Sequence, residues 1–289
     1  NNSHPIVLER THHSLISDNE IITYNLSSGI YLANLSSLNN ITSNNITTYG
    51  DQGHGIYSNY NASQNRIENN YVDVSGNATT GITLLGFSNN YTIANNTLSY
   101  SGNEVFQGIY INASDNNIIL SNLADYQPGT GKWAFYIYDV ENTLVNGLVM
   151  PESVNITTNY LKRVAVDIES SPESHSSELR NLSTFLQILG VTDEAYIDFN
   201  LSYDGVDITS IDESSLRIYW YNGTDWAVLP NSSIDVENNV ISSGNISLSS
   251  LEVFAPLGQS SSMCQTLNSD LLLDINLDTN GSCFTTNSS

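Results

Sequence analysis

Basic residues are scarce in this chain of 289 residues. It holds 7 Lys and Arg against 30 Asp and Glu, which gives a formal net charge of −23 at pH 7. Nucleic acids and anionic membrane surfaces both attract proteins through a basic patch. The charge balance therefore excludes both as partners.

Cysteines and long apolar runs are also scarce or missing. There are two cysteines, Cys264 and Cys283, and no cluster of Cys and His with the spacing of zinc ligands. The chain has no run of 18 apolar residues, and its first residues do not form a signal peptide. We expect a soluble chain without a transmembrane segment, either processed or cut from something longer.

Small polar residues dominate the composition instead. Asn, Ser and Thr number 39, 41 and 22, so 102 of the 289 residues belong to types that favour turns and loop caps. Disorder does not follow, because 39% of the residues are hydrophobic, 17 are Tyr, and the apolar ones recur with a fixed period.

Asn-x-Ser/Thr sequons occur eighteen times, against a chance expectation of 39 × 63/289, or about 8.5. This excess predicts an exported, N-glycosylated protein. Turn-rich β repeats would inflate the count without glycosylation, since Asn and Thr are both common in them. The acceptor positions are Asn1, Asn25, Asn34, Asn40, Asn45, Asn61, Asn77, Asn90, Asn95, Asn112, Asn155, Asn181, Asn200, Asn222, Asn231, Asn245, Asn280 and Asn287.

An internal repeat of about 26 residues runs through the first half of the chain. Gly-Ile-Tyr or a variant begins at Gly29, Gly55, Gly81 and Gly108, in steps of 26, 26 and 27 residues. A second series advances by 26 residues at each step, and Asn stands three residues after its first four members. Its members are Ile41, Ile67, Ile93, Ile119 and Val145, and the asparagines are Asn44, Asn70, Asn96 and Asn122.

Each period holds short β-branched stretches broken by Asn, Ser and Gly, which is the pattern of one coil of a parallel β-helix. Coils stack about 4.8 Å apart, so equivalent residues form ladders. The predicted inward ladder is Ile30, Ile56, Ile82, Ile109 and Phe135. The repeated asparagines would bond coil to coil at a bend. The predicted outward ladder is Tyr31, Tyr57, Tyr110 and Tyr136, interrupted by Thr83.

These blocks resemble the right-handed parallel β-helix repeat of the pectate-lyase-like and carbohydrate-binding-and-hydrolase superfamily. The resemblance covers roughly residues 12–150. It implies the fold and leaves the function open, because that superfamily contains lyases, glycosidases, epimerases and structural spikes.

From Pro151 the period stops and alternating stretches appear, with an Asn222-Gly223 hairpin signal between two of them. Short strands at this spacing predict an antiparallel β-sandwich. It is acidic, with 16 Asp and Glu against 4 Lys and Arg over residues 151–258. Residues 212–219, 223–226 and 235–239 resemble a β-sandwich module of archaeal surface proteins, which implies an archaeal cell envelope.

The last segment, from a Ser-rich linker onward, resembles the opening segment of a β-helix in archaeal surface proteins. That resemblance implies a disulfide between Cys264 and Cys283, and the alternative is two buried reduced thiols. The first residues read as if they begin inside a β-helix, with Leu15 one period before Ile41. Two explanations remain open: copies that follow one another or exchange tails, and a boundary of a partial sequence.

Catalysis is not expected. Polyuronate lyases need clustered cations, but Arg10, Arg66 and Lys132 lie far apart in this region. Glycosidases need two carboxylates about 5 to 9.5 Å apart. Counting acids modulo 26 pairs Asp115 with Glu141, one coil apart, and Asp73 with Asp125, two coils apart. Neither pair has a neighbouring His, and both pairs are also explained as turn residues, or Asp115 and Glu141 as sharing a cation.

Calcium is the inorganic partner that the charge favours, because divalent ions bridge acidic surfaces. The candidate ligands are Asp204, Asp207, Asp212 and Glu213, although solvation alone explains most acidic loops. The outward Tyr31, Tyr57 and Tyr110 offer a strip for glycans or for a neighbouring subunit. The alternative is an ordinary exposed strand.

The sequence thus predicts an all-β protein: a right-handed parallel β-helix over residues 1–150, an acidic antiparallel β-sandwich over 151–258, and a linker with an opening cap over 259–289. The function we expect is a glycosylated building block of an archaeal surface layer or filament, polymerising with copies of itself and requiring no cofactor other than Ca²⁺. The alternative is a carbohydrate-binding adhesin or a glycosidase.

Overall fold

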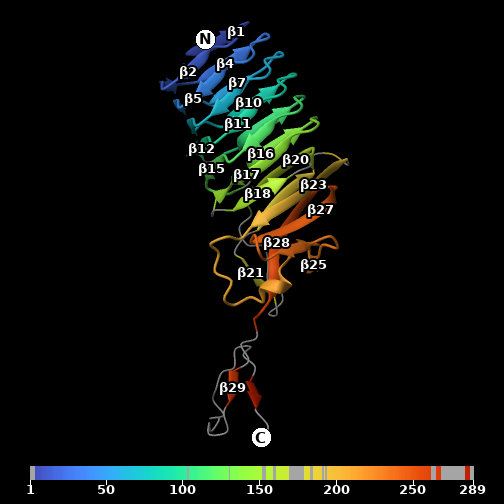
Figure 1. Ribbon diagram of the computed structural model, residues 1–289. Coiled ribbons are helices and arrows are strands. Elements are labelled where there is room, and N and C mark those ends of the chain that lie inside the picture. Colours follow the sequence, from blue (N-terminus) through green and yellow to red (C-terminus); the bar gives the residue numbers. More distant parts are fainter. Residues whose placement is uncertain are drawn as a thin grey trace.

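The computed structural model is almost entirely β (Figure 1). It describes residues 4–102, 104–129, 131–151, 154–158, 161–168, 179–182, 185–190, 192, 194–261, 265–267 and 284–286. Successive coils of a parallel solenoid form the N-terminal part, and two antiparallel sheets follow. The predicted fold class is confirmed.

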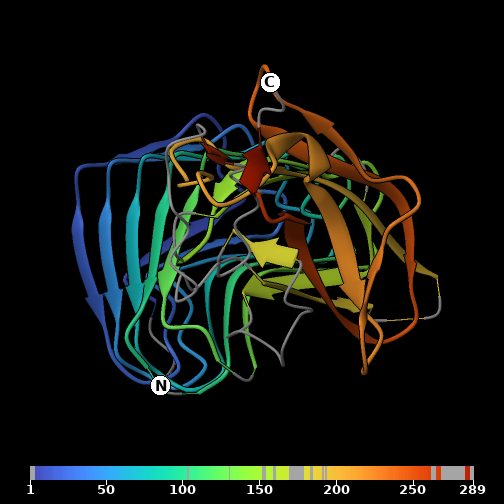
Figure 2. The same cartoon turned by 90° about the horizontal axis from the view of Figure 1, so that it is seen from below.

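Three ladders of parallel strands make up the solenoid, and each coil adds one strand to each ladder until the last (Figures 1 and 2). The first ladder is β1 (Ile6–Glu9), β4 (Ile30–Ala33), β7 (Ile56–Ser58), β10 (Thr79–Leu85), β13 (Phe106–Asn112) and β16 (Lys132–Tyr138). The second is β2 (Leu15–Ser17), β5 (Asn40–Thr42), β8 (Arg66–Glu68), β11 (Thr92–Ala94), β14 (Ile118–Leu120) and β17 (Leu144–Val149). The third is β3 (Glu20–Thr23), β6 (Asn45–Thr48), β9 (Tyr71–Val74), β12 (Thr97–Tyr100) and β15 (Leu123–Tyr126).

The inward ladder has the predicted register. Its residues are direct partners from coil to coil, and each is 0% exposed: Ile30, Ile56, Ile82, Ile109 and Phe135. The prediction for the first coil is wrong, because Ile16 pairs with Ile41 while Leu15 pairs with Asn40 and is 62% exposed. This coil is one residue shorter, so a fixed step of 26 places the wrong residue inside.

The repeated asparagines form the predicted ladder at the corner between the second and third strands. Asn44 donates from its Nδ2 to Asn70 Oδ1 at 2.9 Å, and the same bond joins Asn70 to Asn96 at 2.9 Å and Asn96 to Asn122 at 3.0 Å. The residue before each of them has a positive φ, between 49° and 57°. These bends leave backbone groups without strand partners, and the buried amides satisfy them.

A second asparagine ladder was missed. Asn39 donates to Asn65 Oδ1, and Asn65 donates at 2.8 Å to the hydroxyl of Tyr91, which stands where the next Asn would be. The Tyr91 backbone N–H then donates to Asn117 Oδ1 at 2.8 Å. The signal was present in the sequence, since Asn39, Asn65 and Asn117 are spaced by 26 and 52 residues. The fully buried Tyr91 also bonds Ser58 Oγ at 2.6 Å.

The solenoid passes into the sandwich without a break in its sheets. β16 pairs antiparallel with β20 (Val164–Ile168), and β17 pairs antiparallel with β18 (Asn155–Thr158). One cluster of buried apolar residues runs from Leu8 in the first coil to Phe254 in the sandwich. The predicted boundary near residue 150 therefore marks a reversal of strand direction within a shared core.

The first ladder belongs to one sheet, and the second and third ladders, joined through β17, belong to another. Both sheets continue into the sandwich. One sheet adds β22 (Leu186–Gly190), β28 (Leu251–Gln259), β24 (Arg217–Tyr221), β25 (Trp226–Val228) and β21 (Leu179–Asn181). The other adds β23 (Ala195–Ser202), β19 (Leu161–Lys162), β27 (Val240–Leu248) and β26 (Ser233–Asp235). Phe199 and Phe254 pack between the two sheets with ring centroids 5.9 Å apart. Gly223, with φ +92°, lies in the turn between β24 and β25 that the Asn-Gly signal predicts.

Near the C-terminal end, β29 (Gln265–Leu267) pairs in parallel with β30 (Phe284–Thr286), with Gln265 opposite Phe284. This is the pairing that a coil of a solenoid requires. Cys264 and Cys283 lie outside the described residues, so the predicted disulfide stays a prediction.

The asparagine ladder predicts a large difference between two adjacent positions. Asn44 is buried and its side chain bonds Asn19, Asn70 and the Ile16 carbonyl, whereas Asn45 is exposed. Asn44→Ala should lower the free energy of unfolding by about 2 kcal/mol, since it leaves buried polar groups unpaired. Asn45→Ala should change it by less than about 0.5 kcal/mol. Urea unfolding of the unglycosylated variants measures both, and equal losses would contradict the role of the ladder.

Candidate functional site

The outer face of the first ladder carries an aromatic strip, which we define as Tyr31, Tyr57, Tyr110 and Tyr136 with their ring neighbours. The tyrosines occupy one register position on successive coils, as predicted, with Thr83 between Tyr57 and Tyr110. Ring centroids are 5.4 Å apart for Tyr31 and Tyr57, and 5.6 Å apart for Tyr110 and Tyr136. The tyrosines are half-buried, so the strip presents ring surface to solvent.

The interruption at Thr83 does not open a hole in this strip. Thr83 is 1% exposed although it faces outward, and its Oγ1 is buried without a hydrogen-bond partner. It lies between the coils that carry Tyr57 and Tyr110. The Thr83 position is therefore covered by its surroundings and leaves no solvent-filled gap in the aromatic strip.

Two histidines and one tryptophan extend the strip. The rings of His4 and Tyr31 are 4.9 Å apart, and those of Trp133 and Tyr136 are 6.4 Å apart. His54 stacks on Tyr57 at 5.2 Å, and burial, followed by the nearby His4, lowers the pKa of His54 to about 4. Burial also raises the pKa of Tyr57. The His54 and Tyr57 rings are therefore uncharged at neutral pH, within a strongly acidic protein.

Both predicted acid pairs occupy the registers expected of them. Glu141 donates from its backbone N–H to Asp115 Oδ1 at 2.8 Å, so Asp115 acts as a turn cap between adjacent coils. Asp73 and Asp125 share one outward register position with Ser99 between them.

Asp73 and Asp125 differ in environment. Asp125 is exposed, whereas Asp73 Oδ1 is buried without a hydrogen-bond partner, and burial raises the pKa of this carboxyl. Two coils separate strands by about 9.6 Å. That spacing lies just above the range for inverting glycosidases, about 6.5 to 9.5 Å.

The four predicted calcium ligands are not brought together. Asp207 accepts from the Thr209 N–H, Asp212 caps the 3₁₀ turn η2 (Glu213–Ser215), and Glu213 accepts from the Tyr203 hydroxyl. Asp204 accepts from Asn239 at 3.4 Å. Within the described part of the chain, no group of three or more His, Cys, Asp or Glu residues is placed to hold a metal ion. Calcium binding by these four residues stays a prediction.

The sequons lie on the outside of the molecule. Asn1, Asn280 and Asn287 fall outside the described residues, and the other fifteen acceptor asparagines are each exposed or half-buried. By contrast, the buried asparagines of the described chain do not begin a sequon: Asn39, Asn44, Asn65, Asn70, Asn96, Asn117 and Asn122.

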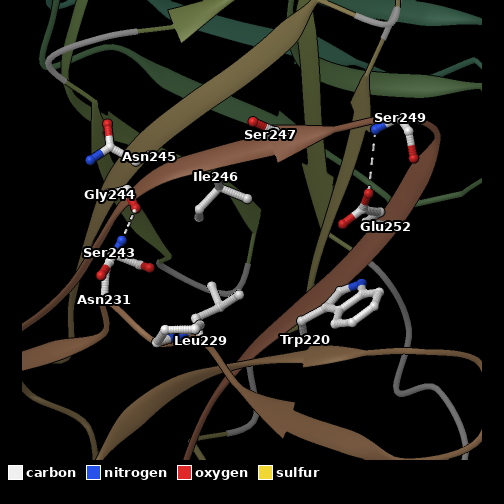
Figure 3. Close-up of a pocket in the computed structure, with 11 residues that line it drawn as sticks. Trp220, Leu229, Asn231, Ser243, Gly244, Asn245, Ile246, Ser247, Ser249 and Glu252 are labelled. Carbon is white, nitrogen blue, oxygen red and sulfur yellow. Dashed lines mark hydrogen bonds between the residues drawn. The ribbon is translucent and has the colours of Figure 1, made fainter.

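A pocket that the sequence did not indicate lies at one end of the sandwich (Figure 3). It has a volume of about 410 Å³. Trp220 of β24, Glu252 of β28 and Ser243 of β27 contribute to its walls, together with the loop before β26. Pairing between distant strands brings these residues together, so no local sequence motif predicts the pocket.

The comparisons with known proteins agree with the solenoid. Residues 1–98 match the family described as the right handed beta helix region. The solenoid is a right-handed parallel β-helix. None of the described helical segments is long and apolar enough to cross a membrane.

One solved structure found by similarity is that of the Dettilon tailspike protein, with 16% sequence identity and a TM-score of 0.28. The match covers 86% of this chain and 56% of the tailspike chain. A TM-score this low gives the likeness no weight for fold or function. The chain matches no curated protein sequence.

The environment of His54 predicts a pH dependence of stability. Its folded-state pKa of about 4 lies below the ordinary value of 6.5, so the unfolded chain takes up the proton first as pH falls. Stability is therefore complete above about pH 6.5 and is lost towards pH 4. At pH 4.5 the loss from this group should be about 2.5 kcal/mol.

His54→Phe keeps a ring against Tyr57 and removes the titration. Urea unfolding at pH 7.5 and pH 4.5 should show a larger fall for the parent protein than for the variant, since carboxyl groups contribute equally to both. Equal falls would show that His54 is not protected from protonation.

Proposed function

We propose that this protein is a glycosylated structural building block of an extracellular surface assembly. The observation that carries the proposal is the separation of two classes of asparagine. Those inside the solenoid bond one coil to the next, and those that begin a sequon face outward. A glycan fits only on the second class, because an oligosaccharide has no room in a packed interior.

Strand alternation explains part of this separation. Two residues after a buried ladder asparagine such as Asn44 or Asn70 stands another inward residue, Ile46 or Val72, which is apolar and so cannot complete a sequon. Alternation of inward and outward side chains along a strand does not explain why other sequons lie at the corners between strands. Asn34, Asn61, Asn90 and Asn95 all lie there with positive φ, which presents the side chain on a bend of the coil.

The rest of the fold suits a load-bearing unit. Backbone ladders and two asparagine ladders join the coils of the solenoid, and both sheets and one core continue from the solenoid into the sandwich. Such a body is stiff along its axis because each coil is bonded to the next across its width. The acidic exterior, with attached glycans, would keep the surface soluble.

Two features support assembly. The aromatic strip offers partly exposed ring surface that a second copy could cover, and the parallel pairing of β29 with β30 supports tail exchange between copies. The proposal includes an archaeal envelope, because the sandwich resembles a module of archaeal surface proteins. It also includes calcium bridging between acidic surfaces, because the net charge is −23.

The alternative is a carbohydrate-binding or carbohydrate-cleaving protein. The aromatic strip favours the binding version, since tyrosine rings stack on sugars. The raised pKa of Asp73, which shares a register position with Asp125 two coils away, favours the cleaving version. Release of reducing sugar from neutral polysaccharides is the reaction that this version requires.

Glycan mapping of protein from its native source tests the proposal. We expect glycans at exposed corner sequons, such as Asn61, Asn90 and Asn95, at higher occupancy than at half-buried strand sequons, such as Asn40 and Asn200. Mass spectrometry of glycopeptides measures both classes in one sample. A native protein carrying no glycan would contradict the extracellular, glycosylated role.

A further inference from the structure

The pocket at the end of the sandwich, which none of the foregoing functions uses, is built from three parts of the chain (Figure 3). Trp220 and Glu252 come from neighbouring strands of one sheet, and Ser243 to Ser247 come from β27 of the other. Leu229 to Asn231 close the third side. The pocket is therefore lined by residues of both sheets.

A bulge in β27 shapes the pocket wall. Ile197 of β23 pairs with Ile246, but Phe199 pairs with Ser243, so β27 holds one extra residue between them. Asn245, with φ +57°, lies in that bulge. Bulges redirect side chains and occur preferentially beside functional sites. Here the bulge places polar groups of β27 at the pocket edge.

From these walls we propose that the pocket binds a neutral pyranose. Trp220 offers an indole beside the pocket, and Leu229 and Ile246 extend the apolar floor. The Glu252 carboxylate, held by the Ser249 N–H at 3.4 Å, is an acceptor for sugar hydroxyls. An apolar surface opposite a few fixed polar groups is the usual design of small-molecule sites, and sugars present both kinds of surface.

The hydrogen-bonding capacity of the walls is not exhausted within the protein. Ser243 is 4% exposed, and its buried Oγ has no hydrogen-bond partner. Buried hydroxyls in proteins are normally bonded, so an unpaired one at a pocket wall marks a place for an outside partner. A ring hydroxyl of the sugar supplies that partner after a small movement of the wall.

Size and charge narrow the ligand class. About 410 Å³ lies towards the low end of small-molecule sites, roughly 300 to 1,000 Å³, which favours one or two rings. None of the eleven lining residues is Lys or Arg, and the protein carries a charge of −23, so uronates and phosphorylated sugars are disfavoured. A single indole is not the aromatic cage that quaternary amines require.

The sugar has two possible sources. Asn231 and Asn245 both line the pocket and both begin sequons, so glycans on either would bring sugars to its mouth. The ligand is then the glycan of the same or a neighbouring copy. The other source is a saccharide from outside. Both require the same pocket chemistry.

The test uses the full chain made in a host that does not glycosylate it. The probes are the methyl pyranosides of glucose, mannose and galactose, N-acetylglucosamine, and choline as the cationic comparison. Calorimetric titration and saturation-transfer NMR measure binding to the parent protein, Trp220→Ala, Glu252→Gln and the control Tyr219→Ala. Tyr219 is similarly half-buried and lies on the same strand, but it does not line the pocket.

We expect at least one pyranoside to bind, and Trp220→Ala to weaken it about tenfold or more. Glu252→Gln should weaken it with an unchanged unfolding midpoint, which guards against misfolding of the tryptophan variant, and Tyr219→Ala should bind normally. No binding of any sugar, binding unaffected at Trp220 and Glu252, or preference for choline would overturn the proposal.

Glycosylated protein from the native source separates the two sources. Equal binding of the added sugar indicates an outside saccharide, and binding seen only in the unglycosylated protein indicates the protein's own glycan. Surface assembly does not depend on this pocket, so either proposal can fail without the other.

Discussion

The hydrogen bond from one buried asparagine amide to the next coil is the interaction on which the rest of the structure depends. Each sharp corner between the second and third strands removes backbone groups from the sheets, and Asn44, Asn70, Asn96 and Asn122 satisfy them. An unpaired polar group there would cost about 1 to 3 kcal/mol in every coil. The ladder fixes the cross-section, which fixes strand register and hence which side chains face out.

A constant register has consequences on both faces. Inside, it stacks isoleucines into a core that continues into the sandwich, where the strands reverse direction but the sheets do not end. Outside, it collects Tyr31, Tyr57, Tyr110 and Tyr136 into one strip and places sequons on the corners. The proposed role as a stiff, glycosylated unit rests on both consequences.

The solenoid could be predicted from the sequence because every coil repeats the same physical demand. Ile41, Asn44 and their equivalents recur with little variation, whereas Leu15 was misplaced because the first coil is one residue shorter. The second asparagine ladder was not predicted, because Tyr91 replaces one of its asparagines. The pocket around Trp220 and the separate bonding of Asp207 and Glu213 depend on pairings between distant segments, which no period encodes.

Electron microscopy of the native material, with and without a calcium chelator, tests the central claim most directly. We expect regular filaments or sheets whose repeat matches this unit, and loss of order on chelation would add calcium to the contacts. Isolated monomers under both conditions would contradict a structural assembly and favour the carbohydrate-binding alternative.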